Sequence, residues 1–454
     1  MDTESREPRG LNAQEQLARE YALSESARYE DGGGRLPNKK GPGFGMGMLF
    51  GSFLTLLVVS VALIGGWTLI RSASSTVDNS GYTAPQTQAQ EGTKGAVTDS
   101  SVDKKAGELA DLIDQYYYEN VDKDALVEGM YAGMTEGLGD PYSSYFTAEE
   151  YASFNESTTG VYYGIGTVLT QDAKTKVVTI LHVYPGTPAE EAGIRDGDVI
   201  AKVGDVAGDS MELSELTTYI KGTEGTTVHL EVIRQGEKDY LGFDVQRRKI
   251  EVPTVEYRML QGNVGLIQIT EFSSATPEQF DEALENLQNQ GMKSMIVDLR
   301  DNPGGVLQSV CDMLDKILPK GILVYTEDKY GSRSNYESDD NCMDIPMAVL
   351  INGNSASASE IFAGAIKDYE YGTLIGTTSF GKGIVQTIIP LDDGSAIKLT
   401  MAKYFTPKGN YIHEVGISPD IELEYEYLNP EDEVYDPMHD NQVQKALEVL
   451  GAGD

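Results

Sequence analysis

The chain has 454 residues, which corresponds to about three domains at roughly 150 residues per domain. It carries 72 Asp and Glu against 35 Lys and Arg, a formal net charge of −37. A nucleic-acid-binding protein needs a basic face to neutralise phosphates, so this charge argues against nucleic acid as a partner. The two cysteines, Cys311 and Cys342, form no C-x-x-C pair and the histidines form no cluster, so no zinc site, other metal or cofactor is expected.

An uncharged stretch lies near the N-terminus, from Gly41 to Ile70. Its core, LFGSFLTLLVVSVALIGGWTLI, is about 22 residues long, enough to cross a bilayer. Seven basic residues precede it, and in the next twenty residues only Arg71 is basic. By the positive-inside rule, residues 44–70 are predicted to form a single transmembrane helix with the N-terminus cytoplasmic. The alternative is a cleaved signal peptide, with RSASS supplying the small residues of a cleavage site.

The polar segments on either side of this stretch are expected to lack a fold. Residues 1–43 would be a disordered cytoplasmic tail, and residues 71–104, rich in Ser, Thr, Gln and Gly, a flexible stalk. On this prediction the lipid bilayer is a partner, the chain is a single-pass protein of the cell membrane, and everything after Ile70 lies outside the cytoplasm.

Residues 105–158 are predicted to form a helical arm. One apolar face has the spacing i, i+3, i+4, i+7 and consists of Leu109, Leu112, Ile113 and Tyr116. A second helix over DALVEGMYAGMTEG is expected to end at Gly137–Gly139.

Two further composition changes divide the rest of the chain. Residues 159–248 contain short β-rich runs, such as KVVTILHV and TTVHLEVIRQG, separated by turns, with one helix over MELSELTTYIKG. Over residues 249–428 strands and helices alternate, which indicates a parallel-rich α/β domain. Residues 429–454 are acidic and end in a short amphipathic helix. The predicted fold class is therefore α/β plus a β-rich module, with a helical arm and a single N-terminal transmembrane helix.

The stretch NGNSASASEIFAGAIKD places three serines, Ser355, Ser357 and Ser359, where a buried strand runs into a helix. A helix N-terminus offers free N–H groups and positive potential, which suit an oxyanion, so a serine there is a candidate nucleophile. The alternative is structural, because Ser357-x-x-Glu360 also has the spacing of a capping box.

A lysine between glycines, Lys382 in GTTSFGKGIVQ, is the second candidate. The stretch nearly matches a phosphate loop, but Gly383 replaces the hydroxyl that would hold magnesium and a strand follows, so nucleotide binding is rejected. A lysine in a dry site has a lowered pKa and can act as a general base; the alternative is a solvated loop lysine. His413 is the reserve candidate for a base.

Paired glycines, Gly304 and Gly305, follow the strand in VDLRDNPGG. Glycines at this place let the backbone approach a ligand and point N–H groups at it. The alternative is a simple turn, which Asn302-Pro303-Gly304 would also make.

Six ordered motifs resemble the carboxyl-terminal processing peptidases, serine proteases of family S41. They span roughly Lys105 to the C-terminus and read GIGTVL, PAEEAGIRDGDVI, VDLRDNPGG, NSASASEIFAGAIKD, SFGKGIVQ and GISPDI. The resemblance implies a PDZ domain over 159–248 and a protease core of the crotonase/ClpP-like α/β type over 249–428. It implies a serine endopeptidase that cuts near the C-termini of exported or membrane proteins.

The resemblance also implies the roles of individual residues. Ser357 would be the nucleophile and Lys382 the general base of a Ser–Lys dyad, with Gln386 orienting the lysine. The oxyanion hole would consist of the backbone N–H groups of Ala358 and of Gly304 or Gly305. The PDZ loop that holds a substrate's C-terminal carboxylate would consist of Tyr163, Gly164, Ile165 and Gly166.

The expected partners are polypeptides with a free C-terminus, and the family implies a possible homodimer through the arm and the tail helix. A second hypothesis is a non-catalytic PDZ adaptor that binds C-terminal peptides and keeps an inactive protease fold. Turnover distinguishes the two, because an adaptor captures a tail peptide without shortening it.

Overall fold

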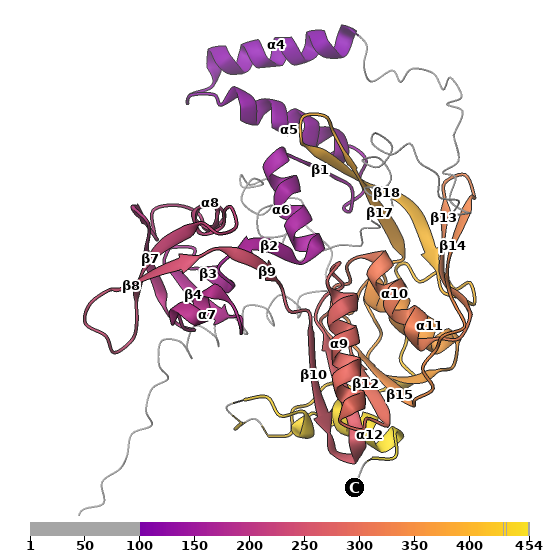
Figure 1. Ribbon diagram of the computed structural model, residues 1–454. Helices are drawn as coiled ribbons and strands as arrows, with labels where there is room; N and C mark the ends of the chain where they lie inside the picture. Colours follow the sequence, from indigo (N-terminus) through magenta and orange to yellow (C-terminus); the bar gives the residue numbers. More distant parts are fainter. Residues whose placement is uncertain (1–99, 430, 433, 453–454) are drawn as a thin grey trace, which may run out of the picture. The chain divides into compact units, whose positions relative to one another are not determined.

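The computed structural model describes residues 100–429, 431–432 and 434–452 (Figure 1). The predicted tail 1–43, the predicted span 44–70 and all of the predicted stalk before residue 100 lie outside this part of the chain. The predicted domain boundaries remain predictions.

The predicted fold class needs one correction, which concerns the transmembrane helix. Among the described residues there is no helix with the length and apolar character that crossing a membrane requires. The segment to which the helix was assigned, 44–70, is not among those residues. The fold is therefore stated without a membrane helix, as a helical arm, a β-rich module and an α/β core.

The arm contains three helices and one short strand. Their bounds are α4 Ser100–Tyr116, α5 Lys123–Glu136, β1 Ser144–Phe146 and α6 Ala148–Thr159. A capping box of Thr147 and Glu150 begins α6, and Gly160, with φ 68°, ends it. A helical arm was predicted over 105–158, which includes nearly all of α6, but only the first two helices were predicted individually and β1 was not predicted.

The β-rich module has its own hydrophobic core, which includes Ile180, Leu216 and Leu230. Its sheet has the strand order β3-β4-β5-β7-β8, with β6 on β5, so β3 is an edge strand. A separate pair, β2 and β9, is antiparallel. The bounds are β2 Val161–Gly164, β3 Thr167–Gln171, β4 Val178–Val183, α7 Pro188–Ala192, β5 Val199–Val203, β6 Val206–Ala207, α8 Leu213–Ile220, β7 Thr227–Ile233, β8 Leu241–Gln246 and β9 Arg248–Glu251.

The α/β core is built on a six-stranded sheet with the order β10-β11-β12-β15-β16-β19. All its pairs are parallel except β10 with β11. Every residue of the central strands β12 and β15 is buried, as expected for parallel strands covered on both faces. The bounds are β10 Val255–Leu260, β11 Val264–Ile269, α9 Thr276–Asn289, β12 Ser294–Asp298, α10 Leu307–Ile317, β15 Met347–Ile351, α11 Ala358–Asp368, β16 Gly372–Gly376 and β19 Ile421–Glu422.

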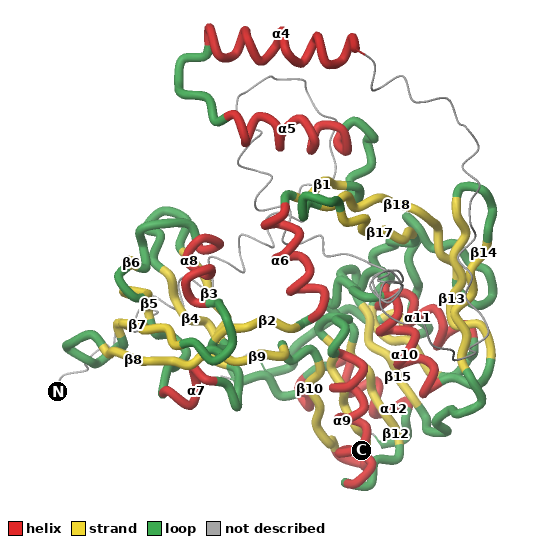
Figure 2. Tube along the Cα trace, turned by 45° about the horizontal axis from the view of Figure 1, so that its top comes forward, coloured by secondary structure: helices red, strands yellow, loops and turns green. Residues whose placement is uncertain are grey.

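Helices cover both faces of this sheet (Figure 2). The face that presents Val297 and Val349 packs against α9, α10 and α11. The opposite face, which presents Ile296 and Leu350, packs against α12, Asn441–Val449. The tail helix predicted from the sequence therefore lies on the core sheet.

A second sheet joins the arm to the core. It has the order β1-β18-β13-β14, with β17 also paired to β18. The new strands are β13 Gly321–Asp328, β14 Arg333–Ser338, β17 Ile384–Pro390 and β18 Ala396–Phe405. Because β1 of the arm pairs with β18, the loop before β1 is held near the residues that precede β17.

Candidate active site

Ser357 occupies the junction between β15 and α11, where it is the N-cap of the helix. Its backbone has φ 60° and ψ −110°, a region that non-glycine residues rarely adopt and that often marks functional sites. The Ser357 side chain is fully buried. It has the capping-box arrangement with Glu360, but only the bond from the Ser357 N–H to the Glu360 carboxylate is well formed, and the Ser357 Oγ has no hydrogen-bond partner of ordinary geometry among the described residues. A buried hydroxyl without a partner is costly to keep, so its position calls for a function.

The two neighbouring serines have structural partners instead. The Oγ of Ser355 donates to the Leu299 carbonyl at 2.8 Å and accepts from the Asn352 N–H at 2.9 Å. The Oγ of Ser359 donates to the Asn302 carbonyl at 2.9 Å. The sequence left three serines open as nucleophiles, and this geometry favours Ser357 because its hydroxyl is uncommitted.

Glu360, on the first turn of α11, joins the serine to the lysine loop. Its carboxylate accepts from the Ser357 N–H at 2.7 Å and from the Lys382 N–H at 2.8 Å. It also accepts from the Ser379 hydroxyl and the Gly381 N–H, both at 2.6 Å. Burial raises the pKa of the Glu360 carboxyl, and these hydrogen bonds oppose the rise.

Lys382 is buried, and burial lowers the pKa of its ammonium to about 8, with the positive charge of Lys398 acting in the same direction. Its Nζ lies 4.8 Å from the ring centroid of Tyr142, in the arm loop before β1. The negative charges of Glu360 and Asp140 oppose this lowering of the pKa, but burial is the larger effect. Roughly a tenth of Lys382 is therefore neutral at about pH 7 and able to accept a proton.

Tyr404, on β18, holds the two candidate residues at a fixed separation. Its fully buried hydroxyl donates to the Lys382 carbonyl at 2.6 Å and lies 3.2 Å from the Ser357 carbonyl. The structure describes no hydrogen bond between Ser357 Oγ and Lys382 Nζ. Such bonds are often long before a substrate tightens the site.

The remaining two predicted residues near the lysine have other partners. Gln386 is buried, and its Nε2 donates to the Thr400 Oγ1 at 3.3 Å, with no described bond to Lys382. A register shift between Val385 and Gln386 sets this pairing. The Nδ1 of His413 accepts from the Gly383 N–H at 3.4 Å, which fits a structural role for the reserve base.

The geometry separates the two candidate glycines. Gly304, with φ 105°, lies so close to Ser357 that an added β-carbon would stand 2.8 Å from the Ser357 β-carbon and 2.9 Å from the Ala358 nitrogen. The Gly304 N–H is committed, however, because it donates to the Asn302 Oδ1 at 2.8 Å. No described hydrogen bond uses the N–H of Gly305 or of Ala358, which leaves these two as the available donors for an oxyanion.

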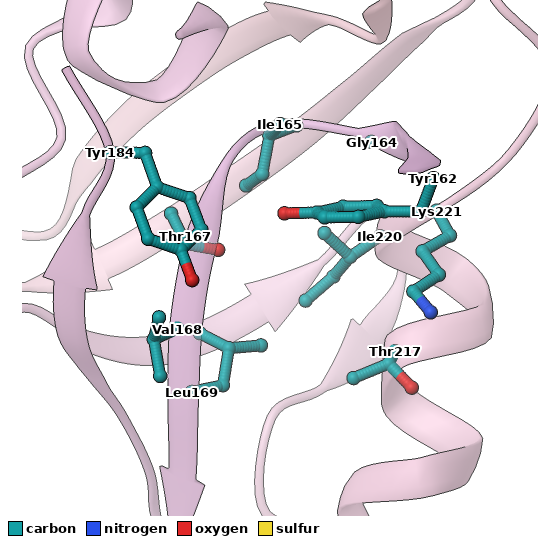
Figure 3. A pocket seen from close by; sticks show the side chains of 10 residues that line it. All are labelled: Tyr162, Gly164, Ile165, Thr167, Val168, Leu169, Tyr184, Thr217, Ile220 and Lys221. Atoms are coloured by element: carbon teal, nitrogen blue, oxygen red, sulfur yellow. The ribbon is translucent and has the colours of Figure 1, made fainter. Parts of the chain in front are cut away.

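A second candidate site is a groove of about 250 Å³ in the β-rich module, between the edge strand β3 and the helix α8 (Figure 3). Gly164 and Ile165 of the predicted carboxylate loop line it. Tyr163 does not line it, and its side chain is 45% exposed. The Ile165 N–H takes part in no described hydrogen bond, and the Gly166 N–H attracts the phenol oxygen of Tyr162, so this loop holds backbone donors that an anion could use.

Sequence reasoning missed three residues of the active site and one of the groove. Glu360 was noted only as a cap, while Tyr142 and Tyr404 lie far from the serine motif in sequence and carry no local signal. Tyr162 lines the groove, one position before the predicted loop. Only the pairing of β1 and β17 with β18 shows why Tyr142 and Tyr404 belong to the site.

Three family models match the chain. Residues 263–423 match peptidase family S41, residues 59–150 match the N-terminal domain of the activating protease CtpB, and residues 179–234 match the PDZ domain. The last match covers the groove helix and most of the sheet of the β-rich module.

Curated relatives resemble the chain over most of its length. The carboxy-terminal processing protease CtpA of Bacillus subtilis (strain 168) is 38% identical over 335 residues, 73% of this chain and 71% of that protein. A probable CtpA-like serine protease of Staphylococcus aureus (strain COL) is 36% identical over 339 residues, 73% of this chain and 67% of the relative. Among solved structures, the photosystem II D1 C-terminal processing protease is 30% identical, with a TM-score of 0.43 and coverage of 74% of this chain and 89% of the other.

Proposed function

The chain belongs to peptidase family S41, as a serine-type carboxy-terminal processing protease with a PDZ domain, and from this premise we propose how its residues act. We propose that Ser357 and Lys382 form a catalytic Ser–Lys dyad and that the PDZ groove selects substrates by their free C-terminus. The observation that carries the proposal is the buried, unpartnered Ser357 hydroxyl, tied through Glu360 and Tyr404 to a lysine whose pKa is lowered to about 8.

The first half of the reaction follows from these two groups. The neutral Nζ of Lys382 takes the proton of the Ser357 hydroxyl, and Oγ attacks the carbonyl carbon of the scissile peptide bond. The carbonyl oxygen becomes an oxyanion, to which the N–H groups of Ala358 and Gly305 donate. The Lys382 ammonium then protonates the leaving amine, which departs and leaves an ester on Ser357.

The second half returns the enzyme to its starting state. Neutral Lys382 takes a proton from a water molecule, the resulting hydroxide attacks the ester carbon, and the same donors stabilise the second oxyanion. Lys382 returns the proton to Ser357 Oγ as the product acid leaves. Gln386, which is committed to Thr400, would support the lysine loop through the β17–β18 pair.

The groove supports tail selection by its architecture. Its edge strand β3 has a free side, so an extended peptide can add as a further strand between β3 and α8. The backbone N–H groups of Ile165 and Gly166 stand at the end of that path, where a terminal carboxylate would bind.

Purified full-length protein tests the proposal with an unstructured substrate that ends in apolar residues. Ser357→Ala should abolish cleavage while the chain stays folded, because the Oγ that it removes makes no hydrogen bond within the described residues. Ser355→Ala and Ser359→Ala, the matched controls, should still cut. Mass spectrometry of the products would also exclude the adaptor, since an adaptor binds the tail and leaves its mass unchanged. Wild-type cleavage by Ser357→Ala would contradict the assignment of the nucleophile.

Two further proposals concern the location of the chain and its oligomeric state. We propose that the part of the chain after Ile70 acts outside the cytoplasm; the basic residues before the uncharged stretch 41–70 support this from the sequence.

We also propose a homodimer through α4. Its helix buries no residue within the described chain, and Leu109, Leu112 and Tyr116 are exposed on it.

A further inference from the structure

Tyr162 fills the part of the PDZ groove that a ligand's C-terminus would need. Its ring lies across the groove from β2, with the hydroxyl directed toward Thr167 (Figure 3). The ring packs against Gly164, where an added β-carbon would stand 2.8 Å from Tyr162 Cε2. Only a glycine at position 164 leaves room for this placement.

The phenol oxygen of Tyr162 lies against the amides of the carboxylate loop. Burial raises the pKa of the Tyr162 phenol well above its usual value, and Tyr184 across the groove adds to the rise. The backbone N–H groups of Thr167 and Gly166 act against it, because they attract the phenol oxygen. Gly166 belongs to the loop predicted to hold a substrate carboxylate, and Thr167 follows it directly, so the phenol and the carboxylate would compete for the same donors.

A charged pair holds the ring in this position from the other side. The Lys221 ammonium, at the end of α8, lies 5.3 Å from the Tyr162 ring centroid. The same ammonium donates to the carboxylate of Glu156 on α6. Both side chains are more than a third exposed, so this pair is weak and allows the ring to leave.

We infer that Tyr162 is a movable plug of the PDZ groove, which must swing out before a substrate's C-terminal carboxylate can bind to the Ile165–Thr167 amides. The inference rests on the proposed tail selection and adds its regulation. When only a fraction of the molecules has an open groove, the apparent affinity for a peptide is the intrinsic affinity multiplied by that fraction. Tails that bind weakly are thereby rejected, since they cannot displace the phenol from the amides.

Peptide binding to the full-length chain with Ser357→Ala, which prevents cleavage, tests the plug. A fluorescent peptide with apolar C-terminal residues is titrated as the free acid and as the amide, and anisotropy gives each affinity. Tyr162→Phe removes only the competing oxygen, so the acid should bind about fivefold more tightly, as expected for losing one hydrogen bond. The amide should gain less, because it has no carboxylate to take the freed N–H groups. Tyr240→Phe is the matched control, the same change on an exposed side chain of the same module.

The outcomes separate the plug from the function on which it rests. If Tyr162→Phe binds the acid peptide no more tightly than Tyr240→Phe does, the plug is overturned and tail selection stays intact. Binding of neither peptide by any variant would overturn both. In a second measurement, 3-fluorotyrosine at position 162 should shift its fluorine resonance toward that of an exposed tyrosine when the acid peptide binds. An unmoved resonance in the peptide-saturated protein would also overturn the plug.

Discussion

At the residue scale, the base is defined by what surrounds it. Lys382 has an ordinary side chain, and burial under Tyr142 together with the charge of Lys398 makes it a base at moderate pH. Of the three serines, the one whose hydroxyl has no structural task is the one tied to this lysine through Glu360. The reactivity of the serine and the lysine therefore depends on contacts with residues from several elements of the core.

Activity should follow the deprotonation of Lys382. With its pKa at about 8, the neutral fraction, and hence kcat/KM, should rise about tenfold per pH unit below that value and level off above it. Lys382→Arg should be inactive at every pH, because a guanidinium does not deprotonate. His413→Ala should keep most of the activity. An active Lys382→Arg together with an inactive His413→Ala would replace the lysine by the histidine as base.

The neighbouring charge offers a finer test of the same base. Lys398 lowers the pKa of Lys382, so Lys398→Met removes a positive charge and should raise that pKa. The rising limb of the pH profile should move toward higher pH with the plateau rate little changed. Lys403→Met, an exposed lysine on the same strand, is the control. A profile that stays in place or moves to lower pH would show that Lys398 does not act on the base.

At the scale of elements, the long periodic segments were predictable and the short ones were not. The helices α9, α10 and α11 and the buried strands β12 and β15 lie in the segment where alternating strands and helices were predicted. The hairpin β13–β14 was missed, because it follows a helix directly and its second strand is polar and half open to solvent. Local patterns named the three serines, Lys382 and the glycine pair as candidates, but the choice of Ser357 and the inclusion of Gln386 came only from the family resemblance. The bond from Gln386 to Thr400 depends on a strand irregularity that no local pattern records.

The helix α4 carries its own prediction, because its apolar face lacks a covering element among the described residues. Replacing Leu109 and Leu112 by Glu should place charges in the proposed dimer contact and convert the dimer to a monomer. Light scattering on the purified chain measures the mass directly. Lys105→Glu, a charge change on the same helix, is the control. A monomeric wild type, or a double variant that keeps the dimer mass, would remove α4 as the contact.

At the scale of the whole molecule, location is the open prediction. Seven basic residues precede the uncharged stretch 41–70 and only Arg71 is basic in the twenty residues after it, and an extracytoplasmic position for the rest of the chain follows from that asymmetry. A protease added to intact cells should degrade epitope tags inserted after Ile70 but leave a cytoplasmic control protein whole. Protection of such a tag until the cells are lysed would place the enzyme inside.

The pairing of β1 with β18 has a consequence for the time at which the enzyme becomes active. Tyr142 is made early in synthesis, the serine and the lysine later, and Tyr404 and the strand that carries it later still. Until that strand leaves the ribosome, β1 has no strand to pair with. Lys382 then lacks the burial that lowers its pKa. The growing polypeptide is thus expected to stay inert while most of it is already made, which protects both itself and its neighbours from premature cutting.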